Sequence, residues 1–380
     1  MSYFHPAESG AERQALAQGL ELTRRGHRVH VVTRFIPGLP VDETVGGILV
    51  HRWIRPIAIG PLFGLSFVAS LIGALRRLRP EYDLIHTHQA LWEAISVGLA
   101  RSLLGDVPTL IQPASSGYFG EASELLRTRG ALILRRAALR NRAFAAISAD
   151  IEREWLGLGV PPDQIIRTAS GVDAHHFRPG PVAPEVEDSL PARPRVVFTG
   201  RLHPQKNLGL LLEAWPAVAR QSGASLILVG QGPERESLAR RMESLGLSNR
   251  VHFVGAVADP AEYLRAADIF VLPSVAEGMS NSLLEAMATG LPCLASEIGG
   301  NIDLLGPGDA GLLLPPDPGI WAASIVRVLN DHELARRLGA SALHRVEEEF
   351  SLEAVVTRYE QIYLQLLNKR PNAGVGLLAE

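Results

Sequence analysis

The sequence of 380 residues has one cysteine, Cys293, two lysines and few aromatic residues. A single cysteine excludes an internal disulfide and is typical of a reducing compartment. Because aromatic residues are scarce and no basic stripe is interleaved with them, the composition does not indicate nucleic-acid binding. The longest apolar run, residues 61–75, is too short to span a bilayer. The first residues have neither a basic start nor an apolar core, so we expect no signal peptide and a cytoplasmic protein.

What the sequence does have is a regular alternation of short apolar strands and helices in residues 1–180. The pattern predicts strands at 27–33, 47–53, 83–87, 108–112, 144–148 and 164–168. It predicts helices at 12–25, 61–79, 91–104, 121–142 and 150–157. Such alternation favours a parallel sheet with helices on both faces.

A proline-rich stretch, residues 180–194, interrupts this alternation and is predicted to be a linker. The alternation then resumes, with strands at 195–199, 225–229, 251–254, 269–273 and 292–296. We therefore predict an α/β fold with two doubly wound, Rossmann-like domains, 1–179 and 195–351, that face a central cleft. Residues 352–380 should supply a last helix that crosses back to the first domain, followed by a tail.

Arginines 127, 129, 135, 136, 140 and 142 all lie in the predicted helix 121–142. One interpretation is an ordinary solvated helix face. The other is a basic surface that faces anionic lipid or a phosphorylated substrate. The sequence leaves both open.

A stretch with the features of an anion site lies at Glu277–Glu285, directly after the apolar strand 269–273. A helix is predicted to begin near Ser280 and to end at Thr289-Gly290. Its N-terminus offers free backbone N–H groups and the positive end of a dipole. Glu277 before the helix and Glu285 inside it could hold different parts of one extended ligand. The alternative is a common strand–turn–helix with a capping glutamate.

Two cations, Arg201 and Lys206, follow the first strand of the second domain. On a loop after a parallel strand they are suitable to clamp a diphosphate, although a simple surface loop is the alternative. Val229-Gly-Gln-Gly-Pro-Glu234 lacks the third glycine of a dinucleotide fingerprint and predicts a tight strand-to-helix turn. The loop that ends at Val257 could present its backbone to a planar base.

Taken in order, these motifs resemble the retaining glycosyltransferases of family 4. The second half carries Gly-Arg-Leu-x-Pro-x-Lys-Asn from Gly200, Val-Gly-x-Gly-Pro-Glu, Val-x-Phe-x-Gly and Glu-x₇-Glu. The first half adds Ser9-Gly10-Ala-Glu12, Asp83-Leu-Ile-His86-Thr-His88 and Gly171-Val-Asp173. The resemblance covers nearly the whole chain. It implies a GT-B fold, a nucleotide-diphospho-sugar donor and retention at the anomeric carbon.

The resemblance also implies roles for individual residues. Arg201 and Lys206 would hold the diphosphate, Glu285 the ribose hydroxyls and Glu277 the transferred sugar. Backbone amides would contact the sugar and phosphates, and these belong to Gly278, Met279, Ser280, Asn281, Ser282 and Leu283. Val257 would meet the base and Gly10 the distal phosphate. The cations would stabilise the leaving diphosphate as its charge develops. No Asp-x-Asp occurs in the chain, so we expect neither a metal nor any other cofactor.

Three departures from the family pattern stand out. Only Met1–Phe4 remain of the usual first strand, which is therefore clipped, or the start lies upstream. Gln112 and the residues after it stand where many relatives have a histidine. His88 is then the remaining catalytic candidate in the first domain, and a structural histidine is the alternative. Ser170 stands where asparagine is common.

The expected function is transfer of a sugar from a nucleotide diphosphate to an acceptor hydroxyl, in glycan, polysaccharide or glycolipid biosynthesis for the cell envelope. A glycan or lipid-linked acceptor and peripheral contact with the inner face of the membrane are expected partners. One alternative is another GT-B enzyme, an epimerase or a phosphorylase. The other is a non-catalytic interaction subunit. The sequence does not define the sugar, the base or the acceptor, which depends on the loops near 34–60 and 113–125.

Overall fold

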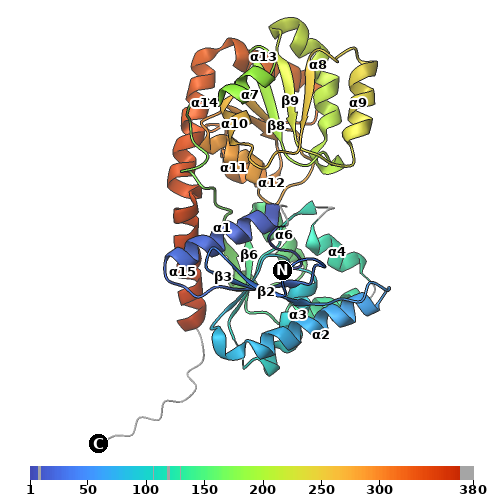
Figure 1. Cartoon of the computed structure of the whole chain (residues 1–380), viewed down its shortest axis with the longest axis vertical. Coiled ribbons are helices and arrows are strands. Elements are labelled where there is room, and N and C mark those ends of the chain that lie inside the picture. The colour runs from blue at the N-terminus through green and yellow to red at the C-terminus, as the bar shows by residue number, and fades with distance from the viewer. Residues whose placement is uncertain (7–9, 106, 118–119, 129, 369–380) are drawn as a thin grey trace, which may run out of the picture. The chain divides into compact units, whose positions relative to one another are not determined.

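The computed structural model describes residues 1–6, 10–105, 107–117, 120–128 and 130–368. The chain divides into two compact units, shown in Figure 1. Unit 1 comprises Met1–Ala169 and the segment that begins at Val355, and unit 2 comprises Ser170–Ala354. Among the residues that the structure describes, no helix combines the length and apolar character needed to cross a membrane.

Unit 1 contains two small sheets. In the first, β1 (His30–Arg34) pairs in parallel with β3 (Ile48–Ile54), and β2 (Asp42–Val45) pairs antiparallel with β3. The second is parallel throughout and is formed by β4 (Ile85–Thr87), β5 (Thr109–Ile111), β6 (Ala143–Ala146) and β7 (Ile165–Arg167). Its helices are α1 (Gly10–Arg24), α2 (Leu62–Arg77), α3 (Trp92–Ala100), α4 (Glu121–Arg127), α5 (Ala131–Ala138) and α6 (Ala149–Gly157). The sequence pattern does not predict β2, because this polar, partly exposed strand has no apolar face.

The single helix predicted over 121–142 is wrong. The structure has α4 and α5 instead, separated by Gly130, which adopts a positive φ of 78°. A left-handed residue cannot continue an α-helix, so the chain turns between the two. Of the arginine cluster, Arg127 therefore lies on α4, Arg135 and Arg136 lie on α5, and Arg140 and Arg142 follow α5, whereas Arg129 lies outside the described residues.

Residues Met1–Phe4 form no strand, yet they lie beside β1. The Met1 amino group donates to the Val32 carbonyl (3.0 Å), and Arg34 N–H donates to the Ser2 carbonyl (3.3 Å). Phe4 is fully buried. A cavity of about 700 Å³ is lined by Met1 and by residues of β1 and β4. β1 and β4 are each an edge strand of their own sheet, and residues of both line this cavity.

Unit 2 is a single six-stranded parallel sheet with the order β10-β9-β8-β11-β12-β13. The strands are β8 (Arg195–Thr199), β9 (Ser225–Val229), β10 (Val251–Gly255), β11 (Ile269–Leu272), β12 (Cys293–Ser296) and β13 (Leu312–Leu314). The helices are α7 (Pro184–Ser189), α8 (Leu208–Ser222), α9 (Arg235–Ser244), α10 (Ala261–Arg265), α11 (Asn281–Ala288), α12 (Gly299–Leu305), α13 (Pro318–Asn330) and α14 (His332–Arg345). When these six strands are numbered along the chain, their order across the sheet is 3-2-1-4-5-6, which is the arrangement of dinucleotide-binding Rossmann folds.

The predicted boundaries of the domains need correction. The division falls after Ala169, because Val172 exchanges backbone hydrogen bonds with Phe350 and Leu352 within unit 2. The expected linker 180–194 instead contains α7, whose Glu187 pairs with Arg195 at 2.8 Å. The last helix, α15 (Leu352–Asn368), starts in unit 2 and belongs to unit 1 from Val355 onward.

Two loops of unit 2 touch through their backbones. Gly200 N–H donates to the Val229 carbonyl (2.9 Å), and Leu202 N–H donates to the Gln231 carbonyl (2.8 Å). A Cβ on Gly230 would lie 1.9 Å from the Gly200 carbonyl oxygen. The Val-Gly-x-Gly segment is thus a turn that supports the loop after β8.

We predict that Gly230→Ala lowers the free energy of unfolding by about 2 to 4 kcal/mol, because the added methyl must displace backbone. Gly246→Ala is the matched control, since Gly246 also has a positive φ but has open space around its Cα. That control should cost only about 1 kcal/mol. Urea unfolding of both variants measures the difference. Equal losses would contradict the backbone contact as the cause.

Candidate functional site

The site in unit 2 begins with the order of the strands. β8 and β11 are neighbours, and the chain proceeds outward from them in opposite directions. Loops that follow such a pair diverge and leave a crevice at the carboxyl ends of the strands, where doubly wound sheets bind ligands. Arg201 and Lys206 follow β8, and Glu277 follows β11. The sheet topology therefore brings together residues that are about 70 positions apart.

Lys206 and Glu277 are in direct contact. Lys206 Nζ lies 2.5 Å from Glu277 Oε1, and Ser274 Oγ donates to the same oxygen at 2.6 Å. Only 15% and 9% of the two side chains are exposed. Gln205 joins the loop after β8 to the loop after β11 through two hydrogen bonds. Its side-chain NH₂ group donates to the Ala276 carbonyl (2.8 Å), and its backbone carbonyl accepts from Val275 N–H (2.9 Å). A buried carboxylate of this kind requires such partners.

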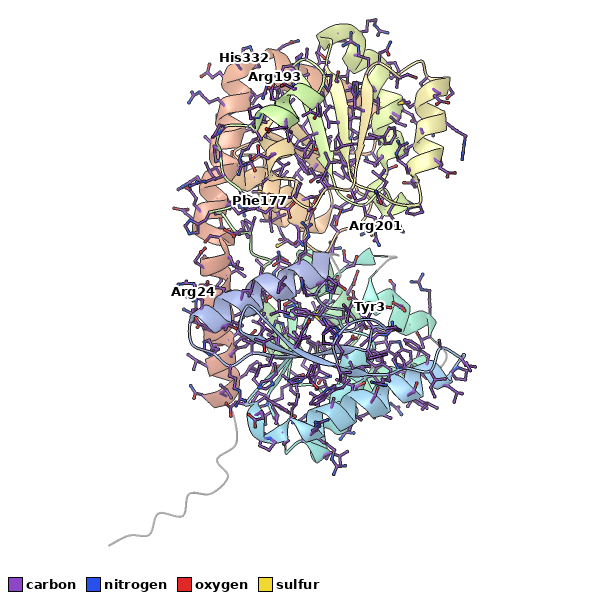
Figure 2. All side chains as sticks on the ribbon, viewed as in Figure 1. Tyr3, Arg24, Phe177, Arg193, Arg201 and His332 are labelled. Atoms are coloured by element: carbon purple, nitrogen blue, oxygen red, sulfur yellow. The ribbon has the colours of Figure 1, made fainter. Side chains whose placement is uncertain are left out.

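Arg201 differs from Lys206 in its exposure. It is open to solvent at the end of unit 2 where β8 terminates, as Figure 2 shows. An exposed guanidinium can contact an anion without losing a buried partner. The two predicted cations are thus present in different states, one paired and one exposed.

The helix predicted to begin near Ser280 is α11, and its start is well defined. The Ser280 hydroxyl caps it by accepting from Leu283 N–H (3.4 Å). Glu285 lies inside the helix and is buried. A Cβ on Gly300 would lie 2.4 Å from the Gly278 carbonyl oxygen, so the first turn of α12 supports the segment before α11.

The remaining predicted residues fall in three places. Val257 is half-buried in the loop after β10, in unit 2. Gly10 is the first residue of α1 and His88 follows β4, both in unit 1. The adjoining Ser9 of the predicted motif lies outside the described residues. Unit 2 alone thus gathers the two cations, the two carboxylates and the start of α11.

His88 packs at a tilt against His86, a histidine that is held from both sides. Its ring centroid lies 4.3 Å from that of His86. His86 Nδ1 is 2.8 Å from the Tyr363 hydroxyl, and His86 Nε2 is 3.0 Å from Gln112 Oε1. Burial lowers the pKa of His86 to about 4 and the pKa of His88 well below its usual value. Both imidazoles are therefore neutral at pH 7.

The sequence analysis missed the partners of this histidine pair. Tyr359 O–H donates to Gln112 Oε1 at 2.6 Å, and the glutamine is buried. Gln112 therefore joins β5 to α15 through hydrogen bonds. The available signal was Tyr359 and Tyr363, four residues apart on one face of the last helix.

Comparison with known proteins decides the family. Residues 9–176 match the family described as Glycosyltransferase Family 4, and residues 193–331 match Glycosyl transferases group 1. D-inositol 3-phosphate glycosyltransferase of Nocardia farcinica is 31% identical over 88% of this chain and 80% of that protein. This chain belongs to glycosyltransferase family 4. N-acetyl-alpha-D-glucosaminyl L-malate synthase of Bacillus anthracis is 25% identical, with 98% of each chain covered.

Solved structures share the fold of this chain. Sucrose-phosphate synthase of Thermosynechococcus elongatus superimposes with a TM-score of 0.78 at 26% identity, over 97% of this chain and 96% of that one. Anabaena HepE, solved with UDP, has a TM-score of 0.76 at 20% identity and shares the fold, over 96% and 100%. The predicted GT-B class and glycosyltransferase activity are confirmed.

One loop of this glycosyltransferase is held by two carboxylates in unit 1. Glu121 accepts from Ala114 N–H (2.8 Å) and from Ser115 N–H (3.1 Å), one bond on each oxygen. Glu154 accepts from Gly117 N–H at 2.6 Å. A hollow of about 390 Å³ is lined by Gly117 and by Asp150, Arg153 and Glu154 of α6. Burial raises the pKa of Glu121 to about 7.

This pKa predicts how stability depends on pH. The unfolded carboxyl loses its proton near pH 4.5, whereas the folded one keeps it until about pH 7. Stability contributed by the protonated form is present below pH 4.5 and is lost as the pH rises through 7. We expect the decrease in Tm between pH 5 and pH 8 to be smaller in Glu121→Gln by on the order of 5 °C. Scanning calorimetry of both proteins across this range checks it. Parallel Tm profiles would show that Glu121 does not titrate there.

Proposed function

We propose that this chain is a retaining glycosyltransferase that moves a sugar from a nucleotide diphosphate to a hydroxyl of a glycan or lipid-linked acceptor. Lys206 and Arg201 hold the diphosphate, Glu277 the transferred sugar and Glu285 the ribose. The amides of residues 278–283 contact the sugar and phosphates, and Val257 meets the base. Gly10 contacts the distal phosphate, and His88 assists transfer from unit 1. The reaction occurs in the cytoplasm.

The observation that supports this proposal most is the Lys206–Glu277 pair at the strand reversal of unit 2. A donor of this class carries a diphosphate and a neutral sugar, and the pair offers one group for each. As the bond to the diphosphate breaks, negative charge develops on the leaving group, and a fixed cation there lowers the barrier.

The same cations make a metal unnecessary in this proposal. Enzymes that rely on a metal clamp use carboxylate ligands to place it at the phosphates. Here Lys206 and Arg201 supply the positive charge instead, and the sequence has no Asp-x-Asp. Attack from the face of the leaving phosphate is consistent with retention at the anomeric carbon.

A nucleotide and substrate screen tests the proposal. Thermal unfolding is followed with UDP, GDP and ADP, because a bound ligand raises Tm. Transfer from UDP-glucose and UDP-N-acetylglucosamine is measured in EDTA with three acceptors from the names of relatives: L-malate, D-inositol 3-phosphate and 2-deoxystreptamine. No protection by any nucleotide at millimolar concentration would refute the donor site. Activity that EDTA abolishes would refute the metal-free mechanism.

The donor roles predict distinct kinetic effects. Lys206→Ala removes a charged contact and should weaken UDP binding about 10- to 100-fold. Glu285→Ala should also weaken UDP binding, whereas Glu277→Ala should lower kcat more than it lowers UDP affinity. Calorimetry with UDP and initial rates separate the effects, with Arg241→Ala on α9 as the control for lost charge. Identical effects of the two glutamate variants on both constants would contradict the division of roles.

Contact with a membrane is a further part of the proposal, and α4 with α5 offers the surface for it. Leu132 and Ile133 are each 72% exposed and Leu126 is 56% exposed. Arg127 and Arg136 are exposed on the same two helices. Exposed apolar side chains beside arginines suit the interface of an anionic bilayer.

Replacing both Leu132 and Ile133 with serine should reduce partition into phosphatidylglycerol vesicles by on the order of tenfold or more, since two apolar side chains no longer insert. Co-sedimentation measures bound protein. Ile320→Ser in unit 2, where the isoleucine is 43% exposed, is the control. The surface is rejected when the double variant and the control sediment like the wild type.

A further inference from the structure

The loop from Pro273 to Glu277 has no regular secondary structure, although it carries a carboxylate of the candidate donor site. β11 ends at Leu272 and α11 begins at Asn281, so neither element fixes the residues between them. Loops move more than helices and strands unless other groups hold them. Glu277 is nevertheless buried, with 9% of its side chain exposed. The position of this carboxylate therefore depends on the contacts of the loop that carries it.

Gln205 holds the middle of this loop from the neighbouring strand β8. Its NH₂ group donates to the Ala276 carbonyl (2.8 Å), and its backbone carbonyl accepts from Val275 N–H (2.9 Å). Because hydrogen bonds are directional, two of them to consecutive residues fix both the position and the direction of the loop backbone. The next residue is Glu277, so the carboxylate follows directly on the anchored segment.

Gln205 is itself held in place. It is the middle residue of the short 3₁₀ helix Pro204–Lys206, and His203 Nδ1 accepts from Gln205 N–H at 3.2 Å. The proline ring restricts φ at Pro204, and Lys206 N–H donates to the His203 carbonyl (2.8 Å). The same turn therefore carries the cation Lys206 and the anchor of the loop that carries Glu277. Gln205 thus links the position of the carboxylate to that of the cation.

Ser274 acts on the carboxylate itself. Its hydroxyl donates to Glu277 Oε1 (2.6 Å), the oxygen that Lys206 Nζ also contacts. A lysine ammonium is a point charge on a flexible stem and does not define the direction of a carboxylate, whereas a hydroxyl on the same short loop does. Ser274 is buried, so water does not compete for this hydrogen bond. The serine and the glutamine thus act on one group, Glu277, through different contacts.

We propose that Gln205 and Ser274 are positioning residues that hold Glu277 where the transferred sugar binds. The role rests on the proposed function, in which Glu277 contacts that sugar. Neither residue touches the reacting atoms, and both act through the carboxylate. Misplacement of a group at the reacting centre by about 1 Å can cost on the order of 100-fold in rate. The quantity that depends on Gln205 and Ser274 is therefore kcat rather than affinity for the nucleotide.

Two substitutions remove these contacts with little change in size. Gln205→Met keeps a side chain of similar length but cannot donate to the Ala276 carbonyl, and Ser274→Ala removes only the hydroxyl. We expect each variant to lower kcat about tenfold, because a displaced carboxylate supports transfer poorly. UDP affinity by calorimetry should stay within about twofold, since the cations are unchanged. Gln221→Met, at an exposed glutamine on α8, is the matched control and should change neither quantity.

Repeating both substitutions in a Glu277→Ala background separates a positioning role from a merely structural one. A residue that acts only through Glu277 has little left to lose once that carboxylate is gone. Each substitution should then lower kcat by less than about twofold further. Transfer is measured on full chains with the donor and acceptor that the screen selects, at a temperature below the Tm of every variant.

Hydrogen exchange tests the anchor without any substrate. The backbone amides of residues 274–279 should exchange about tenfold faster in Gln205→Met than in the wild type, because one of the two hydrogen bonds to the loop is lost. Gln221→Met should exchange like the wild type. Unchanged exchange in Gln205→Met would show that Gln205 does not hold the loop.

Three kinetic results would overturn the positioning role. They are additive losses of kcat in the double variants, an unchanged kcat in both single variants, and UDP affinity that falls in step with kcat. If one single variant does not fold, the other decides alone. Failure of the wild type to bind UDP, or full kcat in Glu277→Ala, would count against the proposed function instead. The exchange measurement would then still report whether Gln205 holds the loop.

Discussion

The reversal of strand order between β8 and β11 is the constraint on which the candidate donor site depends. Because the chain leaves these neighbours in opposite directions, the loops after them separate, and polar groups can occupy the space between. Lys206 reaches Glu277 only because the two strands are adjacent. The glycines at 200, 230 and 300 serve the same arrangement by allowing backbone to approach backbone. The position of the candidate site is thus determined by strand order and backbone packing.

A buried ion pair at this position keeps both of its charged groups partnered. An unpaired carboxylate at Glu277 would be costly away from water, and Lys206 and Ser274 offset that cost. In the proposed function, a donor diphosphate competes with Glu277 for Lys206 while the sugar hydroxyls take the place of the lysine on the carboxylate. Lys206 and Glu277 then change partners, and neither charged group loses its contacts during the exchange. This favours a cation that is already part of the protein over one taken up from solvent.

Prediction from sequence succeeded where a local pattern determines the outcome. The helix at 281–288 carries its own cap and stop, and the apolar strands β8, β9, β11 and β12 of unit 2 are buried along their whole length. Prediction failed for β2, a polar strand that is recognisable only by its pairing with β3. It also failed for the helix 121–142, where Gly130 with its positive φ ends the helix despite the helical periodicity of the sequence. The motifs could predict that Lys206 and Glu277 lie near each other. They could not predict the hydrogen bonds of Gln112 to His86 and Tyr359, because these bonds join segments up to 247 residues apart.

The two units therefore differ in how well their candidate binding groups can be predicted from sequence motifs. In the proposed function, the diphosphate and the ribose are the same in every donor of this class, so a short motif can bind them. Acceptors differ: the names of two relatives of this chain specify L-malate and D-inositol 3-phosphate. A site that must differ between enzymes is built on loops, and a loop keeps one shape only when other elements hold it. The carboxylates that hold Pro113–Gly117 come from α4 and α6, so the shape of this loop depends on tertiary contacts rather than on a motif.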